Sequence, residues 1–146
     1  LLGAIVGAAL VWLAYLPHWA ETKDQAAILG TFATGPAIRN LPANLMTEII
    51  GTFVLVFALL AFGETSFADG TNPMVVGILI LAIGLSLGGP TGYAINPARD
   101  LGPRLAHQFL PIKNKGNSDW SYSLIPIAGP IIGGIVAAGV FNILPL

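Results

Sequence analysis

Long apolar segments that carry almost no charge constrain this chain most strongly. Four segments approach or reach the roughly 20 residues that a helix needs to cross a hydrocarbon core. Only 9% of the 146 residues are charged, whereas a soluble domain carries about 25% charged residues. The sequence therefore predicts an all-α membrane protein. The four segments are residues 1–16, 45–63, 73–89 and 122–146.

The start of the chain and its composition exclude several possibilities. The chain begins without methionine inside the apolar run LLGAIVGAALVWLAYL, so we expect it to start partway through a membrane helix. A formal net charge of −1 gives no reason to expect nucleic acid as a partner. The absence of cysteine excludes disulfides and thiolate metal sites. No nucleophile, base and orienting group occur together, so we expect no enzyme, cofactor or metal site.

The connections between the four segments differ in kind. Residues 64–72 form a short polar turn, which suits antiparallel neighbours. Residues 17–44 are too apolar for disorder, and loops of this length are usually functional. Trp12, Tyr15 and Trp19, near the end of the first segment, suit an interfacial aromatic belt. Residues 90–121 contain the stretch GYAINPARDLGPRL, which places charges directly after an apolar segment.

This stretch predicts a short helix over residues 97–108. Asn96 suits the N-cap and Pro97 the first helical position. The helix is too short to span a membrane, so the stretch GGPTGYAI that leads into it must be buried in protein or line a water-filled cavity. The positive end of the helix would point at the bilayer midplane. Arg99 lies on the same side as Asn96, and an arginine at that depth normally faces an aqueous path.

Other interpretations of the charged residues stay open. An Asn-Pro pair is usually only a turn or a cap, and Arg99 with Asp100 could form an ordinary interfacial pair. Asp100 could also pair with Arg104 one turn later, which is worth a few tenths of a kcal/mol if exposed. Glu48 has two interpretations of equal weight: a snorkelling carboxylate at the interface, or a buried acceptor for backbone N–H groups of the re-entrant loop. His107 is expected to complement the helix dipole or to lie at the interface.

Small residues and prolines give further local predictions. The pair Asn72 and Pro73 suits a helix start. Small residues at helical spacing let membrane helices approach closely, so we expect one tight bundle. The small residues are Gly3 and Gly7, Gly84 and Gly88, and Gly129, Gly133 and Ala137.

The motif resembles the second Asn-Pro-Ala pore loop of the aquaporin superfamily, the major intrinsic proteins. Asp100 is typical of the glycerol-facilitator, or aquaglyceroporin, branch, because water-selective members usually have a small residue there. GTFATGPAIRN is similar to the long third loop of that branch, and GLSLGGPTGYAINPARD is similar to its fifth span and pore loop. Glu48 sits where the family keeps a glutamate in the fourth span. The resemblance covers most of the chain.

The resemblance implies a right-handed bundle of six spans and two half-helices, built from inverted repeats and assembled as a homotetramer. The first repeat, with its own Asn-Pro-Ala loop, is absent from this chain, so these residues alone cannot close a pore. The basic residues of the two long loops oppose the implied orientation under the positive-inside rule, but earlier helices often fix orientation. The implied parts are the end of the third span (1–16), a long extracellular loop (17–44), the fourth span (45–63), the fifth span (73–89), a re-entrant pore loop (90–121) with half-helix 97–108, and the sixth span (122–146).

The resemblance also implies the site residues. The asparagine amide of the motif Asn96, Pro97 and Ala98 donates hydrogen bonds to passing solutes, and Arg99 matches the constriction arginine. Tyr93 matches an aromatic wall that is often phenylalanine, and Gly84 stands where water-selective channels place a histidine. Glycine leaves room for a carbon backbone, and Tyr93 offers an apolar face opposite the donors of Arg99. Glu48 and Asp100 are expected to support the pore loop.

The function implied is passive passage of glycerol and other small neutral solutes, with water, through a multi-pass protein of a bacterial plasma membrane. Ions and protons would be excluded, and the partners would be the solutes, the lipid bilayer and identical subunits. The hydroxyl of Tyr93 could admit lactic acid, dihydroxyacetone or urea. The alternatives are a water-selective channel, an ion-coupled secondary transporter and a non-conducting scaffold or sensor subunit. Coupled transport would call for more buried carboxylates than Glu48.

Overall fold

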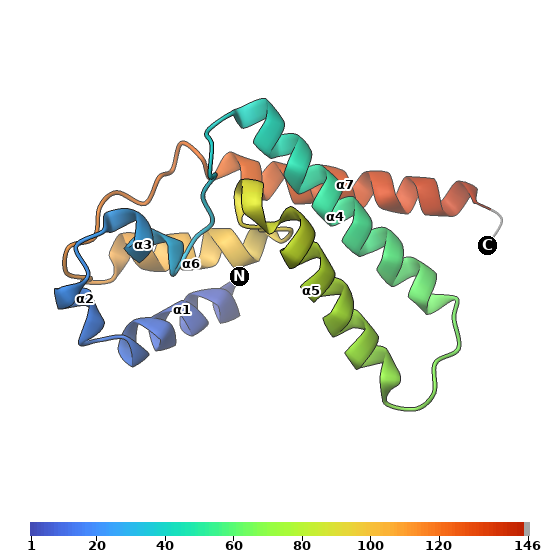
Figure 1. The fold of residues 1–146 in the computed structure, drawn as a ribbon, viewed down its shortest axis with the longest axis horizontal. Helices are drawn as coiled ribbons and strands as arrows, with labels where there is room; N and C mark the ends of the chain where they lie inside the picture. Colours follow the sequence, from blue (N-terminus) through green and yellow to red (C-terminus); the bar gives the residue numbers. More distant parts are fainter. Residues whose placement is uncertain (145–146) are drawn as a thin grey trace.

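The computed structural model describes residues 1–144 and shows an all-helical chain (Figure 1), with no strand in that range. Three helices are long and apolar enough to cross a membrane, and the first helix is a shorter apolar one. The fold class predicted from the sequence is confirmed. The helices are α1 (Leu2–Ala14), α2 (His18–Glu21), α3 (Gln25–Gly30), α4 (Leu41–Gly63), α5 (Thr71–Thr91), α6 (Pro97–Phe109) and α7 (Leu124–Ile143).

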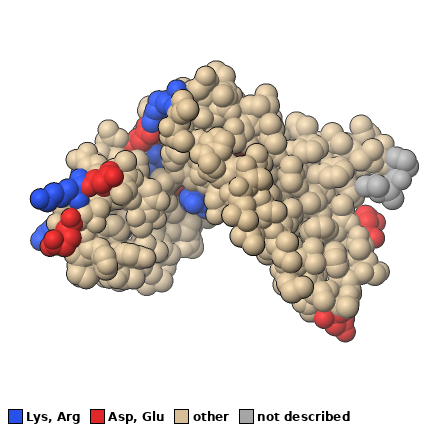
Figure 2. Space-filling view, in the orientation of Figure 1, with Lys and Arg blue, Asp and Glu red and all other residues tan. Residues whose placement is uncertain are grey.

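The helices form two neighbouring groups that meet at α6. The long helices α4, α5 and α7 lie together, and α4 packs mainly against α7 and also against α5. On the other side, α1 packs along α6 and the short helices α2 and α3 lie beside them (Figure 1). Charged side chains gather at the α2 and α3 end and at the turn between α4 and α5, with a wide uncharged surface over the long helices (Figure 2). This distribution suits helices surrounded by lipid.

Glycines set the closest helix contact, as the sequence predicts. A Cβ at Gly129 would lie 2.5 Å from Cβ of Glu48, and one at Gly133 would lie 2.4 Å from the carbonyl oxygen of Ile49. These glycines therefore allow α7 to approach the backbone of α4. Gly3 and Gly7 differ, because outside their own stretch of α1 no atom of the described residues lies within 4 Å of a Cβ placed at either.

The long connection is folded onto α1 and α6. Residues 17–44 contain α2 and α3, and Asp24 caps α3 by accepting from the N–H of Ala26 at 2.9 Å. The loop adds Trp19, Ile28 and Phe32 to a buried cluster with α1 and α6. Trp19 is therefore a core residue, and its assignment to an aromatic belt is wrong, because its ring packs against Phe32.

Several helix ends differ from the expected segments. Helix α4 begins at Leu41 because Asn40 caps it. Helix α5 begins two residues before Pro73, after Gly70 in the left-handed region, so the Asn-Pro pair does not mark its start. It continues to Thr91, so only residues 92–96 of the stretch leading into α6 are irregular. Residues 145–146 of the expected sixth span lie outside the described residues.

Candidate functional site

The N-terminal end of α6 presents a free hydrogen-bond donor. Asn96 lies at the N-cap, where its side-chain oxygen accepts from the N–H of Ala98 at 2.9 Å and of Arg99 at 3.3 Å. Pro97, at the first helical position, has no N–H to satisfy. Because the cap uses the oxygen of Asn96, the amide nitrogen is left to donate, and it has no partner among the described residues. The side chain is exposed.

Arg99 shares an open hollow with this end of α6. The hollow has a volume of about 490 Å³ and is bordered by Asn96, Ala98 and Arg99 and by the small residues of α1. The Arg99 side chain is exposed, and its guanidinium makes no hydrogen bond or ion pair within residues 1–144. The structure therefore brings Asn96, Ala98 and Arg99 together at one hollow. The unused N–H donors there are those of the Asn96 amide and the Arg99 guanidinium.

Tyr93 and Gly84 lie against each other. A Cβ at Gly84 would lie 3.1 Å from Cζ of Tyr93, so the tyrosine ring packs over this glycine. Both residues border a hollow of about 400 Å³, together with apolar residues of α5. This hollow shares no lining residue with the one that contains Arg99. The role of Gly84 in leaving room for a solute stays a prediction.

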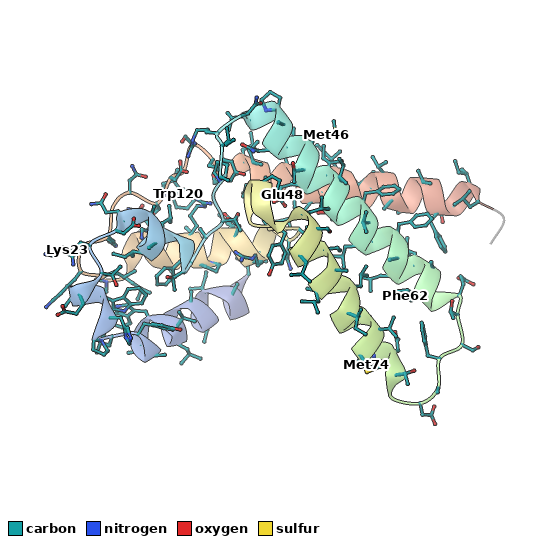
Figure 3. The ribbon with its side chains drawn as sticks, viewed as in Figure 1. Lys23, Met46, Glu48, Phe62, Met74 and Trp120 are labelled. Carbon is teal, nitrogen blue, oxygen red and sulfur yellow. The ribbon has the colours of Figure 1, made fainter. Side chains whose placement is uncertain are left out.

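Glu48 holds the backbone that leads into α6. Its side chain extends from α4 toward the junction of α5 and α6 (Figure 3) and is 1% exposed. One carboxylate oxygen accepts from the hydroxyl of Thr91 at 2.7 Å and from the N–H of Ala94 at 3.0 Å, and the other accepts from the N–H of Ile95 at 2.8 Å. This is the geometry of a buried acceptor and not of a snorkelling carboxylate.

The bonds to Glu48 fall where the backbone is strained. Tyr93 has a φ of 39° and Ile95 a φ of 42°. Left-handed backbone costs a residue other than glycine about 1 to 3 kcal/mol and persists only where the surroundings fix it. Because Glu48 accepts from the N–H groups of Ala94 and Ile95, it fixes this segment and thereby the direction of the Tyr93 side chain.

Asp100 and Arg104 form a buried pair at the middle of α6. Both side chains are 0% exposed, with Nε of Arg104 2.7 Å from Oδ1 of Asp100. Arg104 also donates to the carbonyl oxygens of Thr34 at 2.8 Å, Ser118 at 2.7 Å and Asp119 at 3.0 Å. Asp100 accepts from the N–H of Thr34 at 2.7 Å and from its hydroxyl at 2.6 Å.

The Asp100 and Arg104 pair is therefore a hub that joins two loops to the half-helix. The pairing of Asp100 with Arg104 that the sequence allowed is confirmed. Because the loops cover both side chains, the few tenths of a kcal/mol given for an exposed pair do not apply. Thr34 and Ser118 were missed from the sequence. No signal in the sequence pointed to them, because a guanidinium needs further acceptors only when it is buried, and the burial of Arg104 is seen only in the structure.

A lysine completes the C-terminal end of α6. The ammonium group of Lys115 donates to the carbonyl oxygens of His107 at 2.8 Å, Gln108 at 2.9 Å and Leu110 at 2.6 Å. Burial lowers the pKa of Lys115 below its usual value. His107 is fully buried, with Nδ1 2.8 Å from the hydroxyl of Ser118. His107 is therefore a core side chain, and Lys115 is the cation that contacts the carbonyl groups at this helix end.

Comparisons with known proteins agree with this geometry. The chain is 66% identical over 143 residues to glycerol uptake facilitator protein 3 of Lactiplantibacillus plantarum, covering 98% of this chain and 60% of that protein. It is 58% identical to the glycerol uptake facilitator protein of Bacillus subtilis, covering 97% of this chain and 52% of that protein. It is 45% identical to the D/L-lactic acid transporter of Lactiplantibacillus plantarum, covering 94% of this chain and 59% of that protein.

A solved structure and a family model extend these matches. The X-ray structure of the aquaglyceroporin from Plasmodium falciparum superposes with a TM-score of 0.83 at 29% identity, covering 98% of this chain and 60% of that chain. This chain spans about 60% of the length of the first relative named above. The sequence model of the major intrinsic protein family matches residues 1–141. With the capped half-helix and these matches together, the chain belongs to the major intrinsic protein family of membrane proteins.

Proposed function

We propose that this chain forms one half of a channel through which glycerol, other small neutral solutes and water cross a membrane passively. The observation that carries the proposal is the contrast within α6. Beside an open hollow, the amide nitrogen of Asn96 and the guanidinium of Arg99 have no partner among residues 1–144, whereas the charges of Asp100 and Arg104 are buried and bonded. Relatives named glycerol uptake facilitators support the choice of solute.

We infer that a neutral solute meets two hollows that share no lining residue. At one of them the hydroxyl oxygens of glycerol accept hydrogen bonds from Asn96 and Arg99, and at the other its C–H groups lie against the apolar face of Tyr93. A cation meets the positive end of α6 and the charge of Arg99, and it finds few oxygen ligands to replace its hydration shell. A proton carried by water meets the same positive charge. Flow then follows the gradient of the solute alone, without a catalytic group.

The alternatives have less support. Coupled transport needs a carboxylate that can take up and release an ion. Glu48 is the one carboxylate in α4, α5 and α7, and both of its oxygens are already bonded within the loop. A water-selective channel would need a narrower constriction than Gly84 and Tyr93 provide. The Tyr93 hydroxyl, and a 45% identical relative named a D/L-lactic acid transporter, favour a solute range that extends to lactic acid, dihydroxyacetone or urea.

We propose a multi-pass protein of the bacterial plasma membrane, assembled as a homotetramer in lipid. Three apolar helices of spanning length and bacterial relatives such as that of Bacillus subtilis support the location. In this arrangement residues 17–44 lie outside the cell, and Asn96, Pro97, Ala98, Arg99, Tyr93 and Gly84 line the path. The mass of the detergent-solubilised particle tests the assembly, because a monomer or dimer in mild detergent would contradict it.

Reconstitution of the full-length protein in liposomes tests the function. Vesicle volume is followed by light scattering under gradients of glycerol, urea, lactate and sucrose, with and without proton or sodium gradients. We expect re-swelling with glycerol but not with sucrose, at a rate that is linear in concentration and independent of the ion gradients. Saturation of the rate together with dependence on an ion gradient would instead identify coupled transport.

A substitution at the cap locates the pathway. Asn96→Asp keeps an oxygen that caps α6 but replaces the free amide donor with a negative charge, so we expect glycerol permeability to be lost. Asn40→Asp is the matched control, because Asn40 caps α4 in the same way and accepts from the N–H of Ala43 at 3.2 Å. Equal permeability of the two variants would place the pathway elsewhere.

A further inference from the structure

The ring of Tyr93 lies across two glycines of α5, one helical turn apart. A Cβ at Gly84 would lie 3.1 Å from Cζ of the ring, and a Cβ at Gly88 would lie 3.1 Å from Cδ1. Both distances are shorter than ordinary van der Waals contact between carbon atoms. The glycines were expected to pack against another helix, but in the structure they contact the ring and bring it close to the backbone of α5.

If either glycine gains a side chain, the main chain of Tyr93 cannot shift away from α5 together with the ring. This main chain is fixed on both sides. On one side the N–H of Gly92, at a φ of 75°, donates to the carbonyl oxygen of Gly88 at 2.8 Å. On the other side Glu48 accepts from the N–H groups of Ala94 and Ile95. Tyr93 is 36% exposed. A ring pushed from the α5 side must therefore move toward this exposed side.

We propose that Gly88 is a positioning residue that, together with Gly84, determines how far the Tyr93 ring projects from α5 and therefore which solutes pass. This inference rests on the proposed function, in which the exposed side of the ring borders the path. A side chain at Gly88 would contact the ring and not the solute. It would narrow the path for a carbon chain more than for a water molecule.

Gly89 provides a matched control. It is the next residue of the same helix, and outside its own stretch of α5 no atom of the described residues lies within 4 Å of a Cβ placed there. Gly88→Ala and Gly89→Ala add the same methyl group. Because Gly89 precedes Pro90, its alanine is less favourable in the helix, so the two variants are compared by their glycerol-to-water ratio. They differ in whether that methyl group meets Tyr93.

The test measures glycerol and water permeability of the full-length protein in liposomes. We expect Gly88→Ala to lower glycerol permeability about fivefold while water permeability stays within about twofold, because a displaced ring restricts the larger solute more. Gly89→Ala is expected to keep the glycerol-to-water ratio of the wild-type protein. In a Tyr93→Ala background, where no ring can be displaced, Gly88→Ala is expected to leave the glycerol-to-water ratio unchanged.

Two results would overturn the inference. One is a glycerol-to-water ratio that is the same for Gly88→Ala and Gly89→Ala, and the other is an equal loss of glycerol permeability with and without the Tyr93 ring. If Gly88→Ala does not assemble, Gly84→Ala pushes the same ring from its other end and answers the same question. A wild-type protein that carries no glycerol would refute the proposed function and is distinguishable from both results.

Discussion

Two arginines of α6, five residues apart, have opposite surroundings. Arg104 is 0% exposed and donates to the carboxylate of Asp100 and to three backbone carbonyl groups. Arg99 is exposed beside an open hollow, and its guanidinium has no partner in the part of the chain that the structure describes. The same helix therefore contains one arginine that binds the protein and one whose donors remain free.

The two arginines meet different conditions for stability. A buried guanidinium is stable only when its donors meet acceptors, because an unpaired charge in the interior costs several kcal/mol. An exposed arginine at membrane depth is tolerable only where water reaches it. Arg104 satisfies the first condition through two loops, and Arg99 can satisfy only the second. Substitutions at the two positions should consequently affect different properties.

The largest effect is expected at Arg104. Arg104→Ala leaves the carboxylate of Asp100 buried without its partner, and such a loss costs about 3 to 5 kcal/mol. The free energy of unfolding in mixed micelles measures it. Arg99→Ala is the control, since it removes the same side chain from the same helix. A loss of equal size in both variants would show that the buried contacts of Arg104 do not stabilise the fold more than the exposed side chain of Arg99.

Glu48→Gln is expected to have the next largest effect. Glutamine offers one acceptor oxygen where the carboxylate accepts from Thr91, Ala94 and Ile95. One buried N–H group would be left unpaired, at a cost of about 1 to 3 kcal/mol in unfolding free energy. The control is Glu64→Gln, in the exposed turn after α4. If Glu48→Gln and Glu64→Gln have the same free energy of unfolding, Glu48 does not hold the loop.

Arg39 tests how much of the Arg104 effect depends on burial. It pairs with Asp119 and lies 5.4 Å from the ring centre of Tyr122, but its side chain is 48% exposed. Exposed pairs contribute about 0 to 1 kcal/mol, so Arg39→Ala is expected to lower the unfolding free energy by no more than that. High salt should reduce even this difference. A loss that matches Arg104→Ala would show that burial is not the deciding factor.

The smallest stability effect is expected at Arg99. Substitutions of exposed side chains usually change stability by about 0.5 kcal/mol or less, so Arg99→Ala should unfold like the wild-type protein. Its transport should change, because the charge that opposes protons is lost. A pH-sensitive dye inside liposomes would report faster proton entry, with Arg39→Ala as the control for lost positive charge. Unchanged proton entry would remove Arg99 from the pathway.

Local signals in the sequence were sufficient for much of the fold. The half-helix expected over residues 97–108 is α6, Pro97–Phe109, because Asn96 and Pro97 determine its start through contacts within the same turn. The membership of the major intrinsic protein family, inferred from the motif, is confirmed. For Glu48 the sequence left two interpretations open, and the one confirmed is the buried acceptor for backbone N–H groups of the loop before α6.

The burial of Asp100 and the place of Tyr93 could not be predicted. Asp100 is buried by Thr34, which lies 66 residues away in the sequence, and no local pattern reports such a contact. The ring of Tyr93 reaches α5 because its φ is 39°, a conformation that is rare for a tyrosine. Sequence patterns suggested the residues of the proposed site, whereas long-range contacts determine how those residues face one another.

The glycine contact between α4 and α7 has a consequence for the surrounding lipid. Gly129 and Gly133 leave no room for a methyl group between the two helices, so the pair cannot slide without losing its packing. A thicker or thinner bilayer changes the tilt of a spanning helix, and here both helices must tilt as one body. Glu48, which lies on α4 next to Gly129 of α7, keeps its position relative to both helices. Permeability is therefore expected to vary little with the acyl chain length of the host lipid.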